Sequence, residues 1–122
     1  MHLVARDGVS AFVGDDGAIV RELASPANAP LTRHSLAEIR HPPGTASQEH
    51  YHTEAEVVHF VMEGQGRICV DDEARAIRPG DVVVITPGER HKVWQEGVPE
   101  GALCLDLYAT VPLKLQTNSG LS

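Results

Sequence analysis

The frequent occurrence of glycine and proline is the feature of this sequence that most restricts its fold. Eight prolines and eleven glycines are spread over 122 residues, and no stretch of ten residues carries the clean apolar stripe of an amphipathic helix. Short apolar runs lie between these breaks, and such runs at nearly regular spacing are typical of antiparallel sandwiches and barrels. The sequence therefore predicts an all-β fold, with residues 1–122 forming a single domain.

The expected strands begin with a hairpin. Its two arms, Ala11–Val13 and Ala18–Val20, flank a turn of residues that tolerate positive φ. A loop at residues 25–30 follows, and its two prolines exclude a regular ladder there. The polar tail, residues 116–122, is expected to fray. We expect the remaining strands at residues 35–40, 48–53, 57–62, 67–70, 74–78, 82–85, 91–95 and 102–109.

Charge and composition narrow the range of partners. Seventeen acidic residues against ten basic ones give a formal net charge of -7, which repels phosphate backbones and argues against nucleic acid. No apolar run approaches the roughly 20 residues needed to cross a bilayer, and the first residues lack the layout of a secretory signal. We therefore expect a cytoplasmic protein that binds a small molecule and neither nucleic acid nor a membrane. Cys69 and Cys104 are expected to be small, reduced core residues.

Histidines mark the candidate functional site. The chain has seven, and four of them fall between His50 and His91. On a strand, His50 and His52 would leave the same face about 7 Å apart, with Gln48 before them on that face. Two imidazoles so placed can chelate one ion, and His91 can add a third ligand from another strand. The other three histidines, His2, His34 and His41, have no patterned neighbours and are expected in solvent.

Two blocks of the sequence carry a family resemblance. The first contains Gly44, the run His50-Tyr51-His52 and the run from Phe60 to Gly64, and it resembles the first cupin motif, at about residues 44–64. The second runs from Pro79-Gly80-Asp81 to His91 and resembles the second cupin motif, at about residues 79–95. Similarity to small single-domain cupins of the RmlC-like superfamily implies a double-stranded β-helix, or jelly-roll barrel. It also implies one divalent transition-metal ion in the barrel mouth, held by His50, His52, His91 and a glutamate.

The position of that glutamate is open. Counting forward from His52 reaches Glu56, whereas counting back from Gly64 reaches Val57, which cannot bind a metal. A shift of one residue moves a strand side chain to the opposite face. If the strand runs regularly, Val57 and His59 share the cavity face and Glu56 points away, but a bulge would let Glu56 turn in. We expect Glu56 as the fourth ligand, with His59 completing an all-histidine site if Glu56 is turned out.

The ligand types indicate a working metal site. Neutral imidazole suits Fe, Mn, Ni, Co, Cu and Zn, and three or four protein ligands leave positions open for substrate oxygens or dioxygen. We expect a metal-dependent enzyme acting on a small oxygenated molecule, with an oxygenase as the first interpretation and with His59 and Gln48 facing the substrate. The alternatives are a Lewis-acid isomerase or polyketide-type cyclase, and a non-catalytic module that binds a small ligand or metal. Dioxygen uptake separates an oxygenase from a Lewis-acid enzyme.

The expected assembly is a homodimer. A domain of this size buries only about two-thirds of the surface that its unfolded chain exposes, and the strand edges of small β-domains remain available for pairing. The segments Leu3–Ala5 and Ala11–Val13 are apolar enough to lie across a partner. Small cupins commonly dimerise in this way, so the resemblance implies a dimer through the outer sheet.

Overall fold

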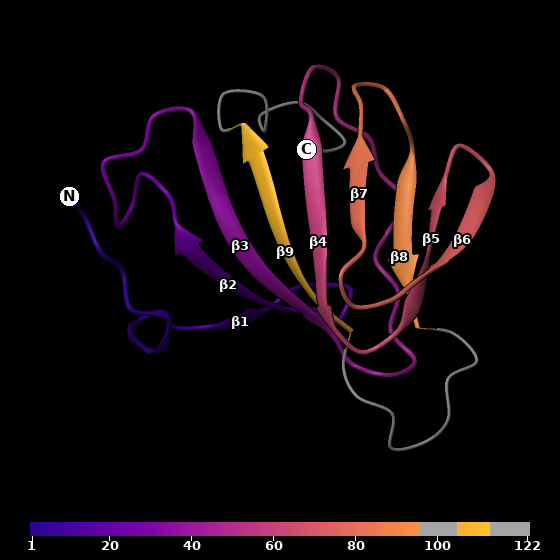
Figure 1. Ribbon diagram of the computed structural model, residues 1–122, viewed down its shortest axis with the longest axis horizontal. Coiled ribbons are helices and arrows are strands. Elements are labelled where there is room, and N and C mark those ends of the chain that lie inside the picture. The colour runs from indigo at the N-terminus through magenta and orange to yellow at the C-terminus, as the bar shows by residue number, and fades with distance from the viewer. Residues whose placement is uncertain (96–104, 113–122) are drawn as a thin grey trace.

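The computed structural model describes residues 1–95 and 105–112, and strands dominate this part of the chain (Figure 1). One short 3-10 turn, η1, precedes them at Arg6–Gly8. The strands are β1 (Phe12–Val13), β2 (Ile19–Ala24), β3 (His34–His41), β4 (Val57–Glu63), β5 (Gly66–Val70), β6 (Glu73–Ile77), β7 (Val82–Ile85), β8 (His91–Trp94) and β9 (Leu105–Pro112).

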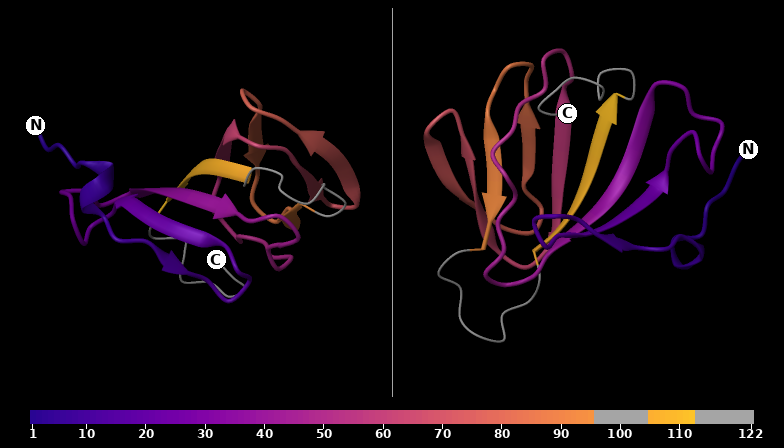
Figure 2. Two further views of the ribbon diagram at one scale, coloured as in Figure 1. Left: turned by 90° about the horizontal axis from the view of Figure 1, so that it is seen from below. Right: turned by 180° about the vertical axis from the view of Figure 1, so that it is seen from behind.

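The strands form two antiparallel sheets. The larger sheet has the order β1-β2-β3-β9-β4-β7, and the smaller sheet has the order β6-β5-β8. The strands β1 and β2 lie at the far end of the molecule from β5 and β6 (Figure 2). This arrangement confirms the predicted all-β fold of the double-stranded β-helix type.

Strict alternation along β4 explains how the larger sheet acquires an inner face. Val57, His59 and Val61 are buried, whereas the residues between them are exposed. The neighbouring strand β9 continues the same face, because His59 lies opposite Ala109 and Val61 lies opposite Leu107. Burying each large aliphatic side chain stabilises the fold by about 1.5–3 kcal/mol. The core cluster consists of Val57, Val61, Ile68, Ile77, Ile85, Val93, Leu105 and Leu107.

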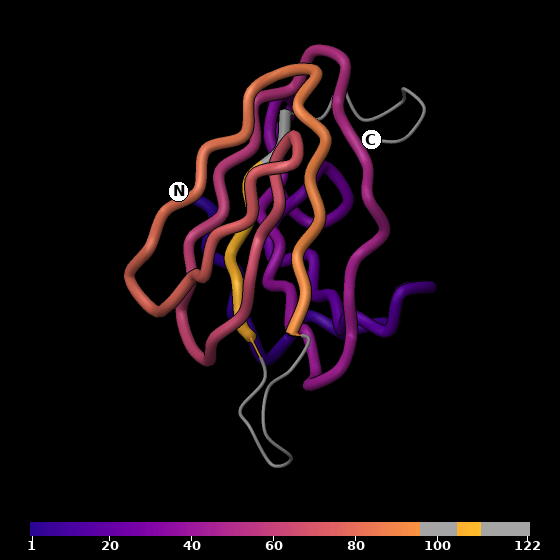
Figure 3. Tube along the Cα trace, turned by 90° about the vertical axis from the view of Figure 1, so that its right-hand side faces the viewer, coloured from indigo at the N-terminus to yellow at the C-terminus, as the bar shows by residue number. Residues whose placement is uncertain are grey.

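The chain between β3 and β4 runs beside β8 without forming a regular strand (Figure 3). It pairs with β8 at two isolated bridges, Ala46 with Trp94 and His50 with His91. At the second bridge, the His50 N–H donates to the His91 carbonyl at 3.1 Å, and the His91 N–H donates to the His50 carbonyl at 2.9 Å. The prediction of a strand over residues 48–53 is therefore wrong, because contact at two points does not build a continuous ladder.

The other expected elements are largely confirmed. The hairpin forms as β1 and β2, with β2 running on to Ala24, and residues 25–30 form no strand. Cys69 is half-buried on β5 and not a core residue, while Cys104 and the tail at residues 116–122 lie outside the described residues. The last strand, β9, begins at Leu105, within the predicted range 102–109. Residues 102–104 of that range lie outside the described residues. Within residues 1–95 and 105–112, no helix is long and apolar enough to cross a membrane.

Candidate metal centre

Three histidines from separate parts of the sequence meet inside the barrel. His50 and His52 come from the segment beside β8, and His91 is the first residue of β8. Nitrogen atoms of the three rings, one from each, all lie within 4.8 Å of one another. His52 and His91 are buried and His50 is half-buried. The structure thus brings together the three histidines that the sequence predicted as ligands.

Backbone carbonyls orient two of these rings. The Nδ1 atom of His50 is 2.9 Å from the carbonyl oxygen of Gln48, and the Nδ1 atom of His91 is 3.2 Å from that of Glu89. A carbonyl oxygen can only accept, so Nδ1 donates in both rings and the lone pair stays on Nε2. The Nδ1 atom of His52 is buried without a hydrogen-bond partner. These imidazoles therefore suit a divalent transition-metal ion, which would also give the His52 ring a partner.

Burial favours the neutral form of two of these rings, those of His52 and His91. It is the main cause that lowers the pKa of His91 to about 4, and the nearby His50 lowers it further. The pKa of His52 is also lowered, first by burial and then by His50. A metal ion binds the neutral form of imidazole, so the protein does not have to lose protons from these two rings before binding at neutral pH.

Glu56 is not part of the histidine group. Its side chain is exposed, and the ladder between β4 and β7 is regular from its first residue, with Val57 opposite Ile85 and His59 opposite Val83. The irregularity in β4 comes later, between Val61 and Glu63. Because the paired residues that follow Glu56 contain no bulge, Val57 and His59 lie on the inner face of the sheet. The role of Glu56 as a fourth ligand stays a prediction, and this register argues against it.

The two expected substrate-facing residues lie in different environments. The residue His59 is 9% exposed, its ring centroid is 6.3 Å from that of His91, and its Nδ1 atom has no hydrogen-bond partner. Burial, followed by the proximity of His91, lowers the pKa of His59 to about 3. Gln48 is exposed, and its backbone carbonyl accepts the hydrogen bond from His50 Nδ1. His59 therefore adjoins the histidine group without belonging to it.

A further histidine, His41, is buried where solvent exposure was expected. His41 is 4% exposed, and its Nδ1 atom has no hydrogen-bond partner. It lies opposite Leu105 in the ladder between β3 and β9, on the inner face of the sheet. Burial lowers its pKa, against a smaller opposing effect of Asp16. The sequence signal that could have predicted this burial is the alternation along β3, which places His41 on the same face as Ala37 and Ile39.

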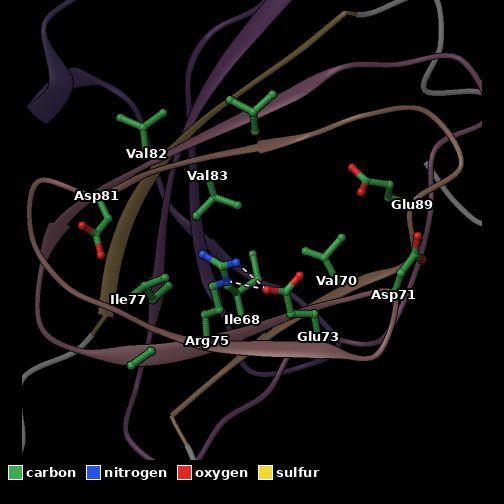
Figure 4. Close-up of a pocket in the computed structure, with 12 residues that line it drawn as sticks. Ile68, Val70, Asp71, Glu73, Arg75, Ile77, Asp81, Val82, Val83 and Glu89 are labelled. Carbon is green, nitrogen blue, oxygen red and sulfur yellow. Dashed lines mark hydrogen bonds and ion pairs between the residues drawn. The ribbon is translucent and has the colours of Figure 1, made fainter.

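A groove of about 580 Å³ lies between the edge strands β6 and β7 (Figure 4). Apolar side chains from β5 and β7, among them Ile68 and Val83, form part of its lining. Arg75 donates a hydrogen bond of 2.6 Å to Glu73 within it. None of the three clustered histidines lines the groove. The groove and the histidine group are therefore separate features of the molecule.

The fold and the histidine group together define the protein class. Residues 37–108 match the cupin domain family, which is more than half of the chain, so the chain belongs to that family. It is 33% identical to an uncharacterized protein of Methanocaldococcus jannaschii over 99 residues, which is 80% of this chain and 79% of the relative.

Two further relatives come from Streptomyces. The chain is 27% identical to the tetracenomycin polyketide synthase protein TcmJ of Streptomyces glaucescens, over 66% of this chain and 54% of that protein. Its fold resembles that of the polyketide cyclase RemF from Streptomyces resistomycificus, with a TM-score of 0.78 and 24% identity, covering 92% of this chain and 79% of RemF. The likeness to RemF concerns the fold alone.

Proposed function

We propose that this chain is a metal-dependent enzyme that binds one divalent transition-metal ion through His50, His52 and His91 and acts on a small oxygenated organic molecule. The observation that carries the proposal is the convergence of three imidazoles, with one nitrogen of each within 4.8 Å of the others. A structural zinc site usually has four protein ligands, often including cysteine. A three-histidine set instead leaves positions open for a substrate.

The residues of this chain prepare the site for binding. When bound, a divalent ion supplies Lewis acidity at its open positions and polarises a substrate oxygen. The carbonyls of Gln48 and Glu89 hold two ligand rings in place before binding. His59, buried beside them, offers one hydrogen bond to a substrate oxygen. The buried side chains of the inner sheet face, such as Leu107, exclude water from the interior.

Lewis-acid cyclisation or isomerisation of a polyketide-type molecule is the reaction we favour. The similarity to TcmJ in sequence and to RemF in fold supports it. Oxygenase chemistry is the second candidate, because a three-histidine set leaves room for a chelating substrate and dioxygen together. The third is a binding module without turnover.

Metal analysis and oxygen uptake test these alternatives. Protein purified without added metal should carry about one transition-metal ion per chain, and His91→Ala should lose it while keeping the fold. Turnover of hydroxylated aromatic ketones without oxygen consumption supports a cyclase or isomerase, whereas stoichiometric oxygen uptake supports an oxygenase. A metal-loaded protein that converts no compound in a broad screen favours a binding module. A folded His91→Ala protein with its full metal content contradicts the metal centre itself.

A further inference from the structure

The histidine group lacks an acidic partner in the part of the chain that the structure describes. No carboxylate from residues 1–95 or 105–112 joins the three rings within ligand distance. On the inner face of β4, the position reached by counting back from Gly64 is Val57, which is 1% exposed and packs in the apolar core. An aliphatic side chain therefore stands where the motif spacing allows a charged ligand.

Four acidic residues lie within four residues of a ligand histidine in the sequence, and none of them joins the three rings: Glu49, Glu54, Glu56 and Glu89. Glu56 is exposed and precedes the first inward residue of β4. Glu89 is half-buried, and its carboxylate accepts hydrogen bonds from the backbone N–H of Thr86 at 2.7 Å and from its hydroxyl at 2.8 Å. Neither Glu56 nor Glu89 is placed to neutralise an ion held by the three rings.

The charge balance of the site follows from this donor set. Three neutral imidazoles leave both positive charges of a divalent ion uncompensated by the described residues. A buried charge is costly because it loses the solvation that water provides. An opposite charge nearby offsets this cost, since the low local dielectric constant strengthens their attraction. Among the described residues nothing supplies the missing negative charge, so an anionic ligand at the open positions, whether hydroxide or an anionic substrate oxygen, would be favoured there.

We infer that this site selects an anionic oxygen chelate, meaning a small organic acid, an enolate or a phenolate, over a neutral molecule of the same shape. The inference rests on the proposed metal centre and names the substrate class for it. His59 supports the selection: its ring is buried beside His91, carries no negative charge and has an Nδ1 atom free of hydrogen bonds. A donor at this position attracts an anionic oxygen, whereas a carboxylate there would repel it.

The test compares two probes with one carbon skeleton on cobalt-loaded protein. Malonate carries two negative charges and malonamide carries none, and the visible absorption of bound Co²⁺ reports the binding of either one without requiring turnover. The variant Val57→Glu adds a carboxylate on the inner face, and Val57→Gln adds the same bulk without the charge. Glu56→Gln is the matched control outside the barrel, where it removes an exposed charge next to the same strand.

We expect Val57→Glu to bind malonate at least about tenfold more weakly than Val57→Gln does, because a nearby buried charge repels the anion. Malonamide should bind both variants equally, and Glu56→Gln should change malonate binding less than about twofold. If Val57 variants do not fold, His59→Glu and His59→Gln provide the same comparison from the next inward position.

The outcomes separate this inference from the proposed function. Equal binding of malonate by the glutamate and glutamine variants overturns the charge argument while leaving the metal centre intact. Failure of the unchanged protein to hold cobalt overturns the metal centre and, with it, the inference.

Discussion

The buried histidine His59 makes the stability of the metal-free protein depend on pH. Burial lowers its pKa from 6.5 to about 3, so the folded ring resists protonation over a range in which the unfolded ring accepts a proton. As the pH falls below 6.5, proton uptake therefore favours the unfolded chain, and the free energy of unfolding decreases. Replacing His59 with leucine removes this contribution and also removes a buried nitrogen that lacks a partner.

The size of the effect at pH 5 follows from the two pKa values. At that pH the unfolded ring is almost fully protonated and the folded ring is almost fully neutral. The difference between 6.5 and 5, multiplied by about 1.4 kcal/mol per pH unit, gives a loss of about 2 kcal/mol. His91, with its pKa lowered to about 4, contributes a loss of similar size. The unchanged protein should therefore lose about 4 kcal/mol from the two rings, and His59→Leu about 2 kcal/mol less.

Urea unfolding at pH 7.5 and pH 5 measures this difference, with a chelator present because a bound ion would itself stabilise the neutral rings. The matched control is His34→Leu, which replaces an exposed histidine at the start of β3 and should not reproduce the effect. An equal loss of stability in the unchanged protein and in His59→Leu would refute the assignment of His59 as a buried neutral group.

Four other outcomes are expected. His91→Ala should lose nearly all bound metal, as measured by elemental analysis. Full retention of the metal in a folded variant would contradict the assignment of His91 as a ligand. Glu56→Gln should keep the metal content unchanged, because the side chain is exposed; a marked loss would restore Glu56 as a ligand. Gly66→Ala should lower the thermal unfolding temperature, since its Cβ would meet the Trp94 carbonyl oxygen at 2.8 Å, and an unchanged temperature would contradict this packing. We also propose a homodimer through the outer sheet face, where Phe60 is exposed; light scattering should give twice the chain mass, and a monomer at micromolar concentration would exclude it.

Local sequence patterns predicted most of the strands, because short apolar runs bounded by turn residues are typical of strands. In β4 a short run of mostly apolar residues indicates a strand, and the breaks on either side mark its ends. The motif spacing likewise predicted that His50, His52 and His91 would share one site. Each of these inferences depends on residues close together in the sequence or on spacings that the fold preserves.

Only the tertiary structure decided which side chains complete the interior. The direction of Glu56 depends on where the ladder between β4 and β7 begins, and a difference of one residue would have reversed it. The burial of His41 depends on the pairing of β9 with the end of β3. The two paired residues, His41 and Leu105, are more than sixty residues apart in the sequence. The sequence by itself determined most of the strands and the three candidate ligands, since these follow from short apolar runs and from motif spacing. The inward positions of Val57, His59 and His41, and thus the charge of the site, were decided by strand register, which is set by pairing between distant segments.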